Sequence, residues 1–180
     1  MYRGFFILNY FNMKIYSILI ILISIIIISS CERKEYTEEG VLQIKHEIDS
    51  LLYHPDAEEH FNWGSSKAYS TFRAYFHNSK LIFINEDYRY RKAGDSFNRY
   101  YFKDGNMLYF IGKEMTFMPD KTYHNTEMMI DPDGNVLTYD NLINGKRVGL
   151  SNEELNKIIE HAKELEKIVS TRMASSKNGK

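Results

Sequence analysis

Three stretches of the chain share one pattern, an apolar segment, a polar turn and a second apolar segment, and this pattern constrains the fold most. They span residues 74–84, 100–111 and 128–139. Two of the turns contain Asp104-Gly105 and Asp133-Gly134. Such pairs favour hairpins, because tight hairpin turns need residues with positive φ. The sequence therefore predicts an antiparallel meander of about six to eight strands.

Composition agrees with a sheet and excludes some functions. The chain has 14 tyrosines and 11 phenylalanines, clustered between residues 61 and 139, and aromatic residues are enriched in strands. Its 23 basic and 24 acidic residues give a net charge of −1, so no bias towards nucleic acid exists and no nucleic-acid partner is expected. The 180 residues leave room for one domain once an N-terminal segment of about 30 is set aside.

Two helices should flank the sheet. In residues 41–52 an apolar stripe at helical spacing runs from Val41 to Leu51, and Pro55 ends the pattern. Ser151 and Glu154 have the spacing of a capping box at the start of a second helix. The apolar stripe of that helix comprises Leu155, Ile158, Ile159, Ala162, Leu165 and Val169. The prediction is an α+β fold, with an antiparallel meander flanked by an N-terminal and a C-terminal amphipathic helix.

The N-terminal segment contains a long uncharged stretch that ends at the only cysteine. Ile15 to Ser30 carry no charge and precede Cys31. As a helix these sixteen residues would span roughly 24 Å, short of the ~30 Å hydrocarbon core, although a marginal spanning helix is possible. Met13 is an alternative start to Met1, and from Met13 onwards Lys14 and the apolar run have the layout of a secretory signal.

The tetrad Ile28-Ser29-Ser30-Cys31 resembles the lipobox of bacterial lipoproteins. The resemblance implies cleavage after the small residues Ser29 and Ser30, and attachment of acyl chains such as palmitate to Cys31. Two or three acyl chains anchor a protein stably, whereas one chain binds only marginally. The charged residues that follow resemble the tether of small envelope lipoproteins of the Bacteroidota lineage, although an ordinary solvated linker is the preferred interpretation.

These patterns divide the chain into four parts. Residues 1–30 are interpreted as a signal peptide, and residues 31–40 as the lipidated cysteine with a charged linker. Residues 41–170 form the single α+β domain, and residues 171–180 a disordered basic tail. The resemblance places the protein at the cell membrane or outer membrane, lipid-anchored and extracytoplasmic.

No motif for catalysis or metal binding stands out. The chain lacks a GxSxG elbow, an HExxH helix and a glycine-rich phosphate loop. His54 and His60 lie near acidic residues, but an ordinary polar loop is the better interpretation. The segment 131–135 resembles the start of a calcium loop, but Leu142 stands where such a loop needs a glutamate, so a hairpin turn is the better interpretation. The sequence therefore predicts no catalytic residues, no metal and no cofactor.

An aromatic recognition surface is the remaining candidate site. Its possible members are Trp63, Tyr88, Arg89, Tyr90 and Arg91, although such residues more often form core or cross-strand pairs. The expected function is a binding or interaction module, with an unidentified envelope protein as partner. A structural tether or assembly component, and an envelope hydrolase acting on glycans or peptides, are the alternatives.

Overall fold

The computed structural model describes residues 36–64, 69–90 and 93–178, with side chains as far as residue 175. The chain divides into two units, Met1–Glu35 and Tyr36–Lys180, and only the second is described. The predicted signal-cleavage residues Ser29 and Ser30 and the predicted lipidation site Cys31 therefore lie outside the described residues. Among the described segments, no helix is long and apolar enough to cross a membrane.

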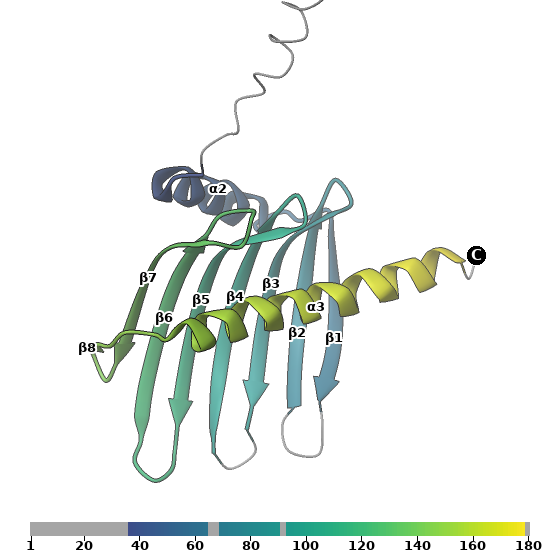
Figure 1. Ribbon diagram of the computed structural model, residues 1–180. Helices are drawn as coiled ribbons and strands as arrows, with labels where there is room; N and C mark the ends of the chain where they lie inside the picture. Colours follow the sequence, from purple (N-terminus) through teal and green to yellow (C-terminus); the bar gives the residue numbers. More distant parts are fainter. Residues whose placement is uncertain (1–35, 65–68, 91–92, 179–180) are drawn as a thin grey trace, which may run out of the picture. The chain divides into compact units, whose positions relative to one another are not determined.

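Eight antiparallel strands form one sheet in which each strand pairs with its sequence neighbours (Figure 1). The predicted α+β fold with an antiparallel meander is thus confirmed. The strands are β1 (Ala57–Gly64), β2 (Tyr69–His77), β3 (Lys80–Arg89), β4 (Gly94–Lys103), β5 (Asn106–Thr116), β6 (Thr122–Ile130), β7 (Val136–Ile143) and β8 (Lys146–Arg147).

The turns between these strands explain why the chain reverses where it does. Asp104 and Gly105, between β4 and β5, have φ angles of +51° and +83°. Gly134, between β6 and β7, has a φ of +88°. Glycine adopts this left-handed conformation without steric cost, so these residues hold the hairpins that the sequence predicts.

Helix α2 (Glu38–Leu51) packs on one side of the sheet. Val41 and Ile48 of the helix join a buried cluster with Phe83, Tyr101 and Tyr109 of the strands. The helix begins three residues earlier than the domain boundary expected at residue 41. The reason is a cap in the predicted linker, because the Thr37 side chain accepts a hydrogen bond from the Gly40 N–H.

Helix α3 (Asn152–Asn178) crosses the other side of the sheet, from the β7 edge to the β1 edge (Figure 1). The predicted capping box is present. The Ser151 N–H donates to the Glu154 carboxylate at 2.8 Å, and the Glu154 N–H donates to Ser151 Oγ at 3.3 Å. The buried side chains of α3 are Leu155, Ala162, Leu165 and Val169, which pack against the strands.

The C-terminal tail differs from the expectation of disorder from residue 171. Helix α3 continues to Asn178. Contacts with the core explain this extension, because Met173 packs against the same cluster as Val169. The Arg172 guanidinium lies 5.1 Å from the centre of the Phe61 ring and donates to the His60 carbonyl at 3.3 Å. The basic side chain thus covers part of β1, the first edge strand.

The sheet side beneath α3 has two chemically different halves. The apolar half contains Phe76, Ile84, Phe102 and Ile130. The polar half consists of two sets of neighbours across the strands, Glu86–Asn98–Gly112–Thr126–Asn141 and Ser96–Glu114–His124. These sets lie two residues apart along the strands, and strand side chains alternate, so both sets face α3.

Candidate functional site

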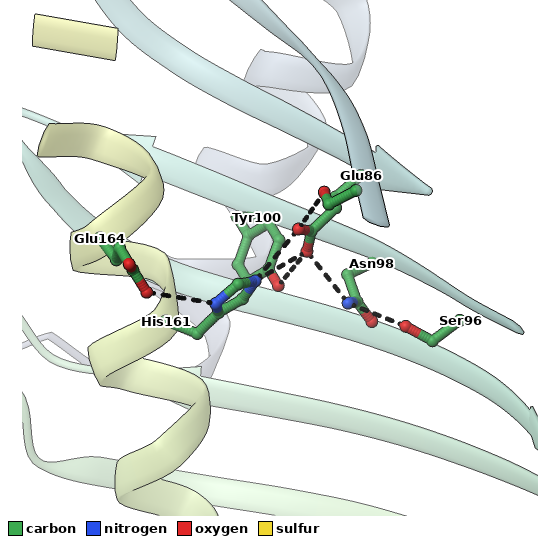
Figure 2. A network of polar contacts seen from close by, with 7 residues as sticks. Glu86, Ser96, Asn98, Tyr100, His161 and Glu164 are labelled. Carbon is green, nitrogen blue, oxygen red and sulfur yellow. Dashed lines mark hydrogen bonds and ion pairs between the residues drawn. The ribbon is translucent and has the colours of Figure 1, made fainter. Parts of the chain in front are cut away.

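The Glu86 carboxylate on β3 is the centre of the polar half, and its side chain is fully buried. It accepts hydrogen bonds from Ser70 Oγ at 2.6 Å, from the Tyr100 hydroxyl at 2.9 Å and from Asn98 Nδ2 at 3.2 Å. Asn98 Nδ2 also lies 3.1 Å from Ser96 Oγ. The two strands that flank β3, namely β2 and β4, therefore supply donors to this carboxylate, and Figure 2 shows those of β4.

His161 supplies the charge opposite Glu86. Its Nε2 lies 3.0 and 3.1 Å from the two carboxylate oxygens, and Figure 2 shows the imidazole extending from α3 towards Glu86. Its Nδ1 lies 3.9 Å from a Glu164 oxygen one turn along the helix. Trp63 and Tyr88 flank the imidazole, with ring centres 5.9 and 6.2 Å away. The pair thus holds α3 against the sheet through a buried, charge-assisted contact.

Each partner stabilises the charged form of the other. Burial alone would raise the pKa of Glu86, but the hydrogen bond and charge of His161, with the hydrogen bonds from Ser70 and Asn98, lower it overall. Burial alone would lower the pKa of His161, but the hydrogen bond and charge of Glu86, with the charge of Glu164, raise it overall. Carboxylate and imidazolium therefore coexist over a wide pH range.

A pocket of about 350 Å³ lies beside this pair, between α3 and the polar half of the sheet. We call it the α3 pocket. Its sheet wall includes Ser96, Asn98, Gly112, Glu114, His124, Thr126 and Tyr90. Its helix wall includes Lys157, Ile158 and His161. The volume lies within the range of about 300–1,000 Å³ that is typical of small-molecule sites.

Gly112 shapes the floor of the α3 pocket. A Cβ at this position would lie 2.6 Å from Cζ of the Phe110 ring and 3.4 Å from Asn98 Oδ1. The absent side chain therefore lets the Phe110 ring lie beside the strand backbone, and it leaves the floor open next to Asn98.

Three polar side chains of the pocket wall are available to a ligand. Glu114 and His124 lie directly opposite each other on β5 and β6, and neither side chain makes a hydrogen bond or ion pair with another described residue. Tyr90 is 38% exposed. Burial, followed by the charge of Glu114, raises the pKa of Tyr90 to about 12, so its hydroxyl stays protonated.

Of the five predicted recognition residues, three lie together on the α3 side of the sheet and one lies on the opposite side. Trp63 and Tyr88 lie with ring centres 6.1 Å apart, and Tyr88 and Tyr90 with ring centres 4.6 Å apart. Tyr90 lines the α3 pocket, whereas Trp63 packs against the core. Arg89 pairs with Asp95 in the strand register and alternates with Tyr88, which places it on the opposite side of the sheet. Arg91 lies outside the described residues.

The other positions considered from sequence make local contacts near the surface. His60 Nε2 lies 3.2 Å from a Glu58 oxygen, but its side chain is 73% exposed on the edge strand. The Asp131 carboxylate accepts from the Asn135 N–H at 2.8 Å, which closes the β6–β7 turn. Within the described ranges, no group of three or more His, Cys, Asp or Glu side chains could hold a metal ion.

Sequence reasoning missed the Glu86–His161 pair and the α3 pocket. A signal for Glu86 was present, because it alternates with Ile84 and Tyr88 and therefore belongs on the inward side of its strand. His161 similarly lies between Ile158 and Leu165 on the apolar stripe of the last helix. A carboxylate and an imidazole on inward faces each need a polar partner, so the two side chains could have been paired with each other.

Comparison with known proteins gives no assignment: no family model, no curated protein and no solved structure matches this chain.

Proposed function

We propose that this chain is a lipid-anchored binding module of the cell envelope, tethered through Cys31, which receives its ligand in the α3 pocket. The tether rests on the resemblance of residues 28–31 to a lipobox. The binding role rests on one observation: Glu114, His124 and Tyr90 line one pocket, and their side chains make no hydrogen bond or ion pair with another described residue.

Rigidity next to the pocket supports binding. Glu86 accepts from Ser70, Asn98 and Tyr100 and contacts His161, so strands β2 to β4 and helix α3 are held in one arrangement. A fully satisfied polar network rigidifies its surroundings, and a preorganised wall loses little entropy when a ligand binds. The α3 pocket therefore has the support that a binding site needs.

The serine hydroxyl that bonds to Glu86 is not placed to act as a nucleophile. Ser70 is fully buried, and its hydroxyl donates to Glu86 at 2.6 Å. A serine nucleophile must instead reach the substrate and give its proton to a base. Ser70 thus supports the pocket wall through Glu86 and does not serve as a nucleophile.

The tether is tested by metabolic labelling with a palmitate analogue. The full chain should incorporate the label and sediment with membranes, whereas Cys31→Ala should do neither. Equal labelling of the two proteins would contradict lipidation and leave the α3 pocket to be judged separately.

The binding role is tested by amide hydrogen exchange of the detergent-solubilised full chain, with and without an extract of envelope components. Slower exchange in β4, β5 and β6 around the α3 pocket is expected. Strands β1 and β2 serve as an internal reference, because neither contributes a residue to this pocket. Unchanged exchange throughout the sheet would contradict the proposed binding role.

A further inference from the structure

We propose that the ligand of the α3 pocket is a saccharide, an uncharged and hydroxyl-rich molecule, which stacks on Tyr90 and bonds to Glu114 and His124. This inference rests on the proposed binding role of the pocket. It differs from the protein partner expected from sequence.

The charges around the pocket balance, which favours an uncharged ligand. Lys113 and Lys157 line the pocket, and so do Glu114 and Glu154. The imidazole of His161 is a further potential cation, but the Glu86 carboxylate at 3.0 Å neutralises it. An anion or cation entering the pocket would leave water without meeting a net opposite charge, and that desolvation costs free energy.

The uncommitted groups match the hydrogen-bonding capacity of hydroxyls. The Glu114 carboxylate only accepts, the Tyr90 hydroxyl both donates and accepts, and a neutral His124 ring offers one donor and one acceptor. A sugar hydroxyl also donates and accepts, so neighbouring hydroxyls on one ring can satisfy all three groups. Glu114 and His124 face each other across paired strands, about 5 Å apart at Cβ, and can bond to adjacent hydroxyls.

Tyr90 supplies a flat surface for the ring of a sugar. Its ring lies 4.6 Å from the Tyr88 ring at an interplanar angle of 62°, and Tyr88 packs in turn near His161. This support fixes the orientation of Tyr90 while 38% of the residue stays exposed. The negative face of an aromatic ring attracts the weakly positive C–H groups of a sugar, while the hydroxyl stays free to bond.

The size of the pocket favours a sugar unit over a folded partner. A specific protein interface usually buries more than about 1,000 Å² and is centred on a broad patch. The α3 pocket is instead a space of about 350 Å³ between a helix and a sheet. One or a few rings of a glycan chain can enter such a space, with the rest of the chain remaining in solvent.

The direct test titrates the detergent-solubilised full chain with uncharged trisaccharides, namely maltotriose, cellotriose, mannotriose and triacetylchitotriose, by calorimetry. At least one should bind, and Tyr90→Ala and Glu114→Gln should each weaken its binding about tenfold. Tyr90→Phe should have a smaller effect, because the ring remains. Failure of all four probes to bind at about 10 mM would overturn the inference.

The matched control is Tyr123→Ala. Tyr123 is also an exposed tyrosine, but it alternates with His124 on β6 and does not line the pocket. Its substitution should leave the affinity for the trisaccharide unchanged. An equal loss in Tyr123→Ala and Tyr90→Ala would place sugar binding elsewhere and overturn the assignment to this pocket.

A second experiment separates this inference from the proposed function. The envelope extract is treated either with protease or with periodate before amide exchange is measured. Periodate cleaves the carbon–carbon bond between two neighbouring carbons that each carry a hydroxyl. Protection of β4–β6 that survives protease and disappears after periodate supports the saccharide. Protection that disappears after protease but survives periodate would keep the binding role and overturn the saccharide.

Discussion

The two halves of the sheet beneath α3 are built from the same strands, yet they serve different purposes. On β4, Phe102 lies in the apolar half and Asn98 in the polar half, four residues apart. The apolar half holds the helix by burying hydrocarbon, which stabilises the fold directly. The polar half buries a carboxylate, which adds stability only when every partner is in place. The difference supports the proposed binding role of the polar half.

The largest effect on stability is expected in the apolar half. Phe102 is buried within the core cluster, so Phe102→Ala should lower the free energy of unfolding by about 3–5 kcal/mol. Urea unfolding followed by circular dichroism measures the change. If Phe102→Ala cost no more than a substitution of an exposed residue, the apolar half would not be the stabilising half.

The next effect is expected from the buried pair. Glu86→Gln removes the nearer and buried counter-charge of His161 and should cost about 3 kcal/mol in urea unfolding. Asp104→Asn is the matched control, because Asp104 pairs with Lys80 at 2.7 Å on the exposed surface. The control should change stability by less than about 1 kcal/mol. Equal losses of stability from the two substitutions would show that the buried carboxylate contributes no more than the exposed one.

Titration should weaken the same pair without mutation. The pKa of His161 is raised above 6.5, so its contribution to stability is complete below pH 6.5 and declines as pH rises through the folded-state pKa. The pKa of Glu86 is lowered below 4.5, so its contribution is complete above pH 4.5 and declines as pH falls through the folded-state pKa. Urea unfolding across pH should show that His161→Gln has a flatter alkaline decline than the parent. Parallel profiles would contradict the assigned pair.

A smaller loss of stability is expected from a substitution that changes the shape of the polar half but not its charge. Gly112→Ala places a methyl group against the Phe110 ring and should destabilise the fold by about 1–3 kcal/mol. It should also weaken binding in the α3 pocket, because the ring or the strand must shift. Calorimetry on the folded variant measures this second effect, and unaltered ligand affinity would show that the floor is not part of the site.

The smallest loss of stability is expected at the start of α3, the helix that covers both halves. Ser151→Ala removes the side chain that accepts from the Glu154 N–H and should cost about 1 kcal/mol. Thermal unfolding detects the change. A loss as large as that of Phe102→Ala would mean that the cap, and not the apolar half, dominates the docking of the helix.

The fold was largely predictable because its determinants are local. Asp104-Gly105 and Asp133-Gly134 fix two hairpins through backbone conformation, and Ser151 with Glu154 fixes the start of α3. These signals span two to four residues and do not depend on the rest of the chain. The extension of α3 beyond residue 170 was missed because it depends on the contact of Arg172 with Phe61, which is distant in sequence.

The candidate site was predictable only in part, because it depends on distant contacts. Tyr90 was singled out from sequence and does line the α3 pocket. Glu86 and His161 are 75 residues apart, and their pairing becomes visible only when α3 lies across the sheet. The alternation of β3 indicates that Glu86 faces inward, but only the folded sheet brings Asn98 opposite Glu86 and the Ser70 hydroxyl within 2.6 Å of it.

The polar half of this face is the proposed ligand site. The most direct measurement is nuclear magnetic resonance of the isotope-labelled full chain, in detergent, during titration with the trisaccharide that binds best. Chemical-shift changes should concentrate at Gly112, Glu114, Thr126 and His161 around the α3 pocket. Changes confined to the α2 side of the sheet, around Tyr101 and Tyr109, would contradict the account.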